Sequence, residues 1–199
     1  MAGMATPYLK ILKHHLARNS SSGFVTLASL EDGKPRARTL LFQGLTEEGA
    51  VCIKCSSDSN KVSKRSSDDV EIVWWMTDTA VQFRLSGKIK YEAGPSSSDT
   101  RRQIWEDLNP AAQGQFFFPK GKLAESLGAP EFEEQRKNYE LSQGAIPHNF
   151  CVGILCPDEV DFLDLNSCGR QTWTKQADGS WEIVHGYAPP VVSTLTQAR

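Results

Sequence analysis

The sequence predicts a mainly β protein, a closed or partly closed antiparallel barrel with peripheral α-helices. Short apolar runs of strand length follow one another along the chain, separated by turn signals. The run from residue 81 to 91 alternates between apolar and polar side chains, as a half-buried strand does. Helical spacing is confined to the N-terminus, a short segment near residue 60 and the middle of the chain. Many short antiparallel strands with few helices are typical of a barrel.

The N-terminal part is predicted to form one helix and three strands. Residues 7–18 carry leucines at helical spacing, and Pro7 suits a first helical position. A hairpin signal at residues 31–35 joins strands at 24–30 and 37–42. A turn at 44–49 then leads into a strand at 50–55.

The remaining elements follow in the same way. We expect a short helix at 58–65, a strand at 70–76, a turn at 77–79 and a strand at 81–91. In this last strand the apolar face holds Val81, Phe83, Leu85, Ile89 and Tyr91, and the polar face holds Gln82, Arg84, Ser86, Lys88 and Lys90. Helices at 98–108 and 130–141 flank an aromatic loop at 116–122, and strands return at 150–155, 160–165, 170–175 and 181–185.

Composition favours one ordinary globular domain. The 199 residues include 22 basic and 24 acidic side chains, a formal net charge of −2. This balance offers no electrostatic case for a nucleic-acid partner. No apolar run approaches the roughly 20 residues needed to cross a bilayer. The N-terminus lacks the apolar stretch of a secretory signal, so we expect a cytoplasmic protein without a membrane partner.

The cysteines and histidines predict neither a disulfide framework nor a metal site. Five cysteines, an odd number, argue against paired disulfides in an intracellular chain. Cys52 and Cys55 have the C-x-x-C spacing of zinc and redox sites, but residues three apart on a strand face opposite sides. We therefore expect buried, chemically quiet thiols. Among the histidines only the adjacent pair His14 and His15 lies close in sequence, so no metal-ligand spacing is present.

No nucleotide-binding glycine motif and no nucleophile elbow is present. Several polar residues instead stand alone on predicted strands or at a helix start: Arg38, Thr39, Ser59, Asn60, Lys61, Gln82 and Arg170. A phosphate monoester is bound by Arg or Lys together with hydroxyl or backbone donors. Spacing alone leaves open whether these residues bind a phosphate or are ordinary solvated side chains.

The order of these residues resembles the pyridoxamine 5′-phosphate oxidase-like superfamily of FMN-binding split β-barrels. Residues 33–41 resemble its G-x-P-x-x-R-T-V-L strand, and Gln82 to Gly87 its Q-V-x-x-x-G strand. Ser59-Asn60-Lys61 is similar to its S-R-K turn, with Asn60 in place of arginine. The branch of cyanobacterial type, a pyridoxamine-phosphate-oxidase-related FMN-binding domain, has further similar segments at 99–105, 118–119, 147–150 and 160–163.

The resemblance implies a single FMN-binding domain over residues 1–199, an antiparallel, Greek-key-like split β-barrel. It also implies a homodimer with FMN at the subunit interface. Arg38 and Lys61 would bind the FMN phosphate, helped by the hydroxyl of Thr39 or Ser59. Asn60 would lie in the same turn.

The resemblance places other residues at the flavin ring. Backbone groups of Leu40 and Leu41 would run along the isoalloxazine. Gln82 would hydrogen-bond the ring, and Arg170 would lie near the ring or the phosphate. Phe150 takes the place of a family tryptophan beside the flavin.

The departures from the family pattern concern the substrate. Gln43 stands where the oxidase has a substrate-holding lysine, and its arginine–histidine pair falls at about Asn166 and Cys168. Its substrate-phosphate clamp has no convincing match, although Arg101 and Arg102 could substitute. The resemblance therefore favours an FMN-dependent oxidoreductase with an unidentified small-molecule substrate. It assigns no catalytic residue, because the flavin itself can accept a hydride.

Three alternatives stay open. One is a genuine pyridoxamine or pyridoxine 5′-phosphate oxidase of vitamin B6 salvage, which Gln43 disfavours. Another is a flavin-binding module without turnover. The last treats the aromatic residues 116–118 as a protein-interaction surface.

Overall fold

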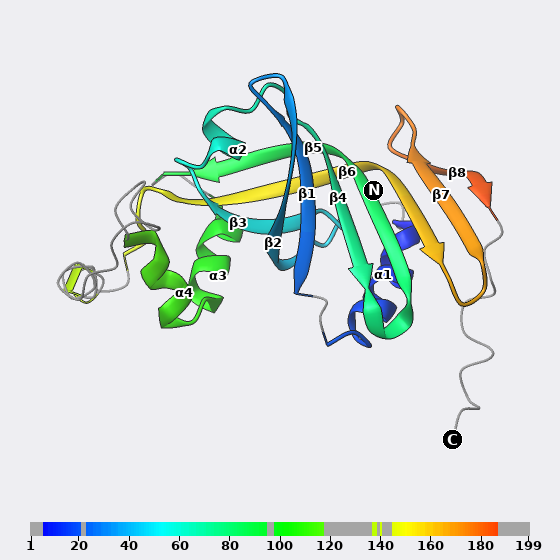
Figure 1. Cartoon of the computed structure of the whole chain (residues 1–199), viewed down its shortest axis with the longest axis horizontal. Coiled ribbons are helices and arrows are strands. Elements are labelled where there is room, and N and C mark those ends of the chain that lie inside the picture. Colours follow the sequence, from blue (N-terminus) through cyan, green and yellow to red (C-terminus); the bar gives the residue numbers. More distant parts are fainter. Residues whose placement is uncertain are drawn as a thin grey trace. The chain divides into compact units, whose positions relative to one another are not determined.

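The computed structural model describes residues 6–20, 23–94, 98–117, 137–138, 140 and 145–186 (Figure 1). Its strands are β1 (Phe24–Glu31), β2 (Lys34–Leu45), β3 (Val51–Ser56), β4 (Asp69–Met76), β5 (Val81–Ala93), β6 (Phe150–Asp164), β7 (Gly169–Lys175) and β8 (Trp181–Gly186). The helices are α1 (Pro7–Leu16), α2 (Asn60–Ser63), α3 (Asp99–Asp107) and α4 (Pro110–Gly114), with 3₁₀ turns η1 (Thr77–Thr79) and η2 (Gln115–Phe117).

The described strands form one sheet in the order β3-β2-β1-β4-β5-β6-β7-β8. A further pairing between β3 and β6 closes the first six strands of this order into an antiparallel barrel. β7 and β8 continue the sheet beyond β6. The predicted fold class, mainly β with peripheral helices, is therefore confirmed.

Most predicted elements are confirmed, with ends that differ by a few residues. The helix expected at 58–65 is only α2, and the strands expected at 150–155 and 160–165 are the single strand β6. Gly87 explains this continuity. A Cβ there would lie 2.3 Å from Cys156 O and 2.9 Å from Pro157 Cα, so only a glycine lets β5 approach β6 beside the proline. The helix expected at 130–141 and the loop after residue 117 fall largely outside the described residues.

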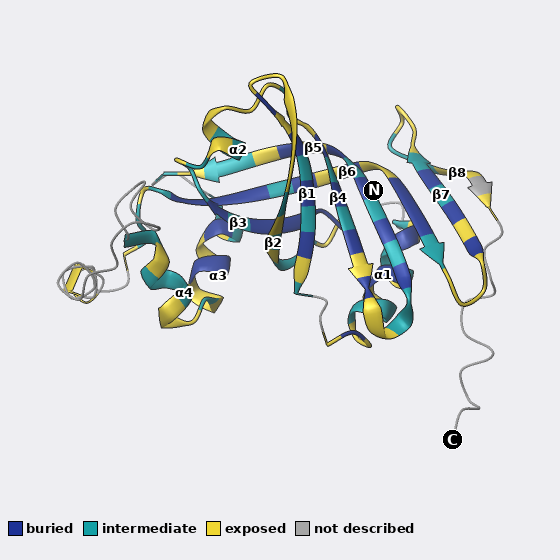
Figure 2. Cartoon of the chain, in the orientation of Figure 1, coloured by how far each residue is buried: buried dark blue, intermediate teal, exposed yellow. Residues whose placement is uncertain are grey.

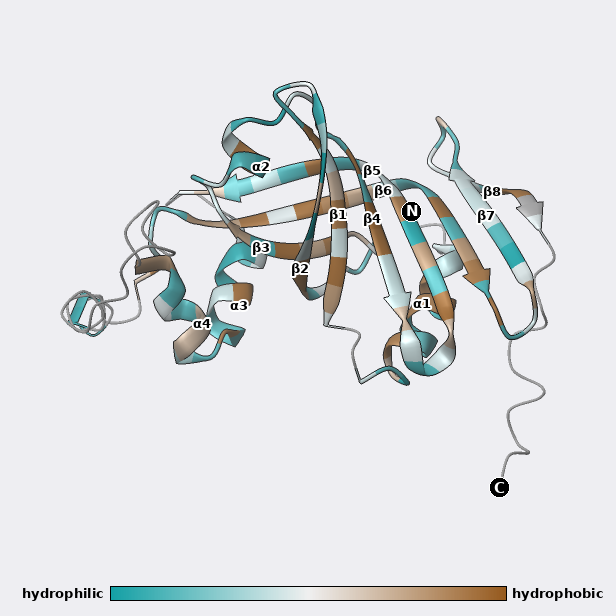
Figure 3. Cartoon of the chain, in the orientation of Figure 1, coloured by the Kyte–Doolittle hydropathy of each residue, from teal (hydrophilic) through white to brown (hydrophobic). Residues whose placement is uncertain are grey.

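The chain divides into two compact units. Unit 1 is Met1–Ile53, Arg65–Lys90 and Ile154–Arg199, and unit 2 is Lys54–Lys64 and Tyr91–Gly153. The core of unit 1 lies on one face of its strands, which alternate between buried and exposed residues in Figure 2 and between apolar and polar residues along β5 in Figure 3. The predicted apolar residues of β5 that belong to this unit are buried: Val81, Phe83, Leu85 and Ile89.

Helix α1 packs in unit 1 through Tyr8 and Leu12, both fully buried. The Tyr8 ring lies edge-on to Trp181, with ring centroids 5.2 Å apart, and its hydroxyl donates to Gly49 O at 3.2 Å. These contacts tie the helix to β8 and to the turn before β3. The amphipathic opening helix is thus confirmed.

His15, at the end of α1, is half-buried between aromatic rings of the same unit. Its ring centroid lies 6.1 Å from that of Phe83 and 5.6 Å from that of Phe162. Its Nδ1 lies 3.0 Å from the hydroxyl of Thr79. Burial is the main cause that lowers the pKa of His15, so the structure favours its neutral form.

Unit 2 has a small aromatic core of its own. The rings of Trp105 and Phe116 both pack edge-on to Phe150, with centroid distances of 4.9 and 4.8 Å. Phe116, from the predicted aromatic loop, is therefore engaged with its own unit. No described helix combines the length and the apolar character that crossing a membrane requires.

Candidate functional site

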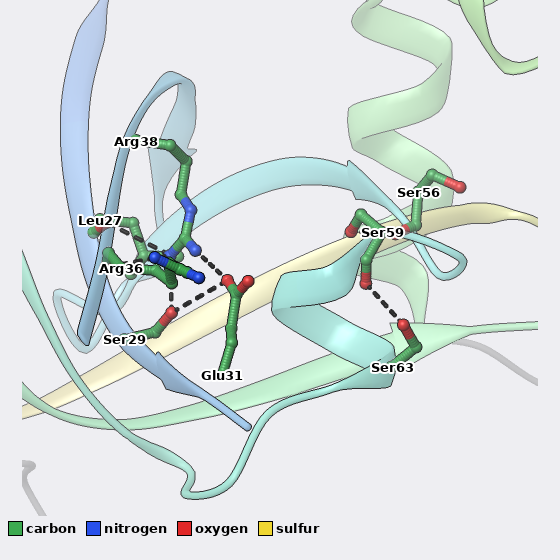
Figure 4. A network of polar contacts seen from close by, with 8 residues as sticks. All are labelled: Leu27, Ser29, Glu31, Arg36, Arg38, Ser56, Ser59 and Ser63. Atoms are coloured by element: carbon green, nitrogen blue, oxygen red, sulfur yellow. Dashed lines mark hydrogen bonds and ion pairs between the residues drawn. The ribbon is translucent and has the colours of Figure 1, made fainter. Parts of the chain in front are cut away.

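Arg38 lies on β2, on the face whose β1 neighbours are buried. It stands opposite Leu27 in the β1–β2 register. Its Nη1 donates to Ser29 Oγ at 2.6 Å and to Leu27 O at 3.4 Å, and its Nη2 forms an ion pair with Glu31 (Figure 4). Its side chain is 22% exposed, that of Glu31 9%. The predicted phosphate ligand is thus already paired within its own chain.

β2 carries a row of basic side chains on this face. Lys34, Arg36 and Arg38 are two residues apart, so they point to the same side of the strand. Lys34 and Arg36 are exposed, and none of the 12 residues of β2, all of them described, is buried. Such a row has the donor chemistry that a phosphate monoester requires. Our sequence reasoning missed Lys34 and Arg36, although strand alternation from Arg38 points to both.

The four predicted residues of this strand divide between its two faces. Leu40 stands opposite the buried Val25 and shares the face of Arg38. Thr39 and Leu41 point to the other face, where Leu41 is 41% exposed. The Arg–Thr pair therefore does not present both side chains to the same side.

Gln82 lies on the same face as Leu41, three strands away. Leu41 stands opposite Phe24, and Trp75 opposite Gln82. The β1–β4 register pairs Thr26 with Val73, and its continuation by two residues brings Phe24 beside Trp75. Leu41, Phe24 and Trp75 thus form an exposed apolar row that ends at Gln82, with Phe24 57% and Trp75 43% exposed.

Arg170 belongs to an ion network on this same face. Its Nε and Nη2 donate to the two carboxylate oxygens of Asp161 at 2.8 and 2.9 Å, and this pairing raises the pKa of Arg170. Thr172 also donates to Asp161, at 3.3 Å. Arg84 Nη1 lies 3.9 Å from Asp161 Oδ2, and its Nε lies 3.4 Å from Glu71 Oε1. The side chain of Asp161 is 6% exposed and that of Arg170 61%, so the arginine presents the outer surface of this network.

The predicted turn Ser59-Asn60-Lys61 lies in unit 2 and opens α2. Ser59 is the N-cap residue, but its hydroxyl donates to Ser56 O at 2.6 Å (Figure 4). Its own carbonyl accepts from the hydroxyl of Ser63 at 3.2 Å. Asn60 is exposed and Lys61 half-buried. These contacts order the turn from within.

The cysteines of the C-x-x-C motif are buried, as predicted, and they do not pair with each other. The thiol of Cys55 instead hydrogen-bonds Cys151, within unit 2. That bond is the main cause that lowers the pKa of Cys151, with help from the charges of Arg101 and Lys61. The same bond and burial raise the pKa of Cys55.

Arg101 is not placed to replace the missing substrate clamp. It is 2% exposed, and its Nε and Nη2 donate to Phe150 O at 3.0 Å and Pro147 O at 2.9 Å. Its role is to satisfy backbone carbonyls of unit 2. Arg102, the other suggested residue, has a side chain that is 62% exposed beside Asp99.

Comparison with known proteins finds a family model that matches the N-terminal part of the chain. Residues 5–92 match the model of the pyridoxamine 5′-phosphate oxidase FMN-binding domain. The N-terminal part of the chain, up to residue 92, is thus similar to the FMN-binding domain of this family. Over 194 residues it is 26% identical to pyridoxine/pyridoxamine 5′-phosphate oxidase 2 of Arabidopsis thaliana, covering 92% of this chain and 95% of that protein.

Solved structures share the fold of this FMN-binding chain. A pyridoxamine 5′-phosphate oxidase-related, FMN-binding protein of Nostoc punctiforme is 24% identical and superposes with a TM-score of 0.79 over 94% of this chain and 100% of the other. PhzG of Burkholderia lata, solved with tetrahydrophenazine-1-carboxylic acid, is 16% identical, with a TM-score of 0.70 over 95% and 99% of the two chains. These structures confirm the predicted fold, and the family-model match over residues 5–92 agrees with the predicted family and its FMN cofactor.

The donor set of unit 1 fits the chemistry of FMN. The basic row on β2 suits its phosphate, and the amide of Gln82 can both donate to and accept from the polar edge of an isoalloxazine. The two groups lie on opposite faces of the same sheet, because Arg38 and Leu41 alternate along β2.

Proposed function

We propose that the chain is an FMN-dependent oxidoreductase for a small molecule, and that it works as a homodimer in which two copies share each flavin. The observation that carries this proposal is the division of the FMN residues between the two faces of one sheet. Arg38 and Leu40 lie on one face, and Thr39, Gln82 and Arg170 on the other.

Side chains on the two faces of a sheet point in opposite directions, so we infer that one flavin does not contact both groups within one copy. We infer that one copy supplies the face of Arg38 and its partner supplies Gln82 and Arg170. A two-fold dimer makes such a site twice, since each copy offers both faces.

The exposed apolar row of Leu41, Phe24 and Trp75 supports a second copy as the partner. Contiguous exposed apolar side chains, aromatic ones above all, are typical of protein interfaces. The row ends at Gln82, so a copy that covers it lies directly beside one of the proposed flavin residues. In a two-fold dimer the row of each copy would be covered by the partner copy.

In this dimer the basic row around Arg38 holds the phosphate, and Gln82 orients the ring. Arg170 adds a positive charge near the flavin, and its pair with Asp161 fixes its direction. The backbone of Leu41 runs along the ring. The FMN, when bound, supplies the acceptor for a hydride from the substrate. The roles of Ser59, Asn60 and Lys61 stay predictions, as does a cytoplasmic location.

The test is an absorbance spectrum of the purified protein, before and after addition of FMN. We expect flavin bands, and their loss under anaerobic conditions on addition of NADPH, NADH or a substrate from a panel of small reductants. Protein that stays colourless and fails to retain added FMN would contradict the proposal. Bound FMN that resists every donor would favour the flavin-binding module without turnover.

A second candidate is pyridoxamine or pyridoxine 5′-phosphate oxidation, which the name of the Arabidopsis relative favours. Gln43 argues against it, because its amide lacks the charge of a substrate-holding lysine and donates locally to Phe42 O at 3.0 Å. The PhzG structure also holds a compound other than a vitamin B6 phosphate in this fold. We expect the FMN-loaded protein to form no pyridoxal phosphate at saturating pyridoxamine phosphate, and steady formation would establish this activity.

A further inference from the structure

Glu31 is a buried carboxylate at the end of β1. The residue is 8% exposed and its backbone is fixed on both sides, by the hairpin partner Lys34 and by a β-bridge to Arg65. The turn that follows is held as well, because Asp32 and Gly33 have φ of 48° and 71°, the left-handed values of a two-residue hairpin turn. Glu31 is therefore a rigidly placed negative charge.

Arg38 reaches this carboxylate by leaning along its strand. Ser29 stands opposite Arg36 in the register, yet its hydroxyl accepts from Arg38. The guanidinium of Arg38 thus extends toward the hairpin turn, where Glu31 meets its Nη2 (Figure 4). Its Nη1 also lies 3.4 Å from Leu27 O and 3.5 Å from Arg36 O. Both terminal nitrogens are engaged by acceptors of this same hairpin.

A carboxylate and a phosphate bind the terminal fork of an arginine in the same way. Resting on the proposed function, we propose that Glu31 is an internal competitor of the flavin phosphate for Arg38, and that it sets how strongly the chain discriminates FMN from unphosphorylated flavin. A phosphate that takes the terminal fork of Arg38 displaces Glu31 from Nη2, and the buried carboxylate then repels the phosphate dianion. Glu31 weakens FMN binding through both effects.

Glu31 could also have the opposite effect on FMN binding. If Glu31 merely held Arg38 in place for the phosphate, its removal would weaken FMN binding. The sign of the change therefore decides between competition and positioning. Binding of riboflavin, which has no phosphate, reports every effect that is not specific to the phosphate.

The experiment compares the wild type with Glu31→Gln, which keeps the size of the side chain and an acceptor oxygen but removes the charge. Titration of flavin fluorescence gives the Kd of each apoprotein for FMN and for riboflavin. We expect FMN to bind about tenfold more tightly to E31Q, as loss of a competing charged hydrogen bond predicts, and riboflavin to bind as before. Unchanged or weaker FMN binding, or an equal change for both flavins, would overturn the proposal.

The control is Glu47→Gln, which removes the same charge from an exposed turn of unit 1. We expect it to change neither Kd. A second measurement uses inorganic phosphate as the probe in place of flavin. Phosphate should raise the thermal midpoint of E31Q apoprotein more than that of the wild type. An equal rise in both would contradict the competition.

The double variant Glu31→Gln with Arg38→Gln separates this inference from the proposed site. If Arg38 binds the phosphate, the double variant loses the preference for FMN over riboflavin. A preference like that of the wild type would remove Arg38 from the site and overturn the inference along with it. Loss of preference in the double variant, together with no gain in E31Q, would overturn the competition alone.

Discussion

At the scale of single residues, both predicted cofactor arginines are held by carboxylates of their own chain. Arg38 is paired with Glu31, and Arg170 with Asp161. Each carboxylate is largely buried, so it depends on its arginine for compensation of its charge. Each arginine that would bind the ligand therefore also stabilises the fold. Replacing the arginine alone would leave its carboxylate buried and unpaired.

Arg101 illustrates a buried positive charge that donates to backbone carbonyls. Arg101→Met would leave the carbonyls of Phe150 and Pro147 without their donors inside unit 2. We expect the free energy of unfolding to fall by about 2–4 kcal/mol, measured by urea denaturation. Arg102→Met on the same helix removes an exposed charge and should change it by less than about 0.5 kcal/mol. Equal effects of the two variants would contradict the role of Arg101.

The burial of His15 predicts that the free energy of unfolding depends on pH. Its pKa is lowered from 6.5, first by burial and then by His14, with a small contribution from Arg18, and Asp164 opposes this lowering. The unfolded chain therefore binds more protons in this range, so the stabilising effect is complete above about pH 6.5 and is lost as pH falls through the folded-state pKa. Urea unfolding between about pH 7.5 and 5 should show this loss. In His15→Gln the slope should be shallower, and an unchanged slope would assign the loss to other groups.

At the scale of elements, alternation and turn chemistry made most of the sheet predictable. The faces of β5 follow directly from its pattern, and the hairpin turn between β1 and β2 follows from its Asp-Gly pair. β6 was wrongly divided, because Pro157 is a strand-breaking signal and its tolerance depends on Gly87, 70 residues earlier. Long-range compensation of this kind leaves no local trace in a sequence.

A larger residue at position 87 should therefore disrupt the packing of β5 against β6. Gly87→Ala would place a Cβ 2.3 Å from the backbone oxygen of Cys156, which a flexible side chain cannot relieve. We expect a loss of stability of about 2–4 kcal/mol in urea unfolding. Gly114→Ala, at the end of α4, has open space around it and should be neutral or slightly stabilising. A neutral G87A would contradict the close approach of these strands.

The candidate site was only partly predictable. The motif located Arg38 to Leu41, and the structure adds that strand alternation separates them into two pairs. The basic neighbours Lys34 and Arg36 follow from the same alternation. The role of Glu31 does not follow from alternation, because its pairing with Arg38 depends on how the long arginine side chain extends along the hairpin. Register and side-chain direction are properties of the folded sheet, and sequence order does not contain them.

At the scale of the whole molecule, the proposed flavin site requires a second copy of the chain. Every strand that carries a proposed flavin residue of unit 1 belongs to one sheet, yet those residues lie on both of its faces. The exposed row of Leu41, Phe24 and Trp75 gives that sheet a surface for association. A homodimer unites the two groups of residues without any change in the fold.

Subunit complementation tests this claim most directly. One variant, E31Q with R38Q, removes the phosphate ligand together with its buried partner, and the other, D161N with R170Q, does the same for the arginine of the opposite face. Each dimer alone should fail to retain FMN. After dissociation and random reassociation, the mixture should retain about a quarter of the flavin of the wild type, because half of the dimers are mixed and one of their two sites is intact. Mixed dimers that form but hold no more flavin than either parent would show that each site is built within one copy.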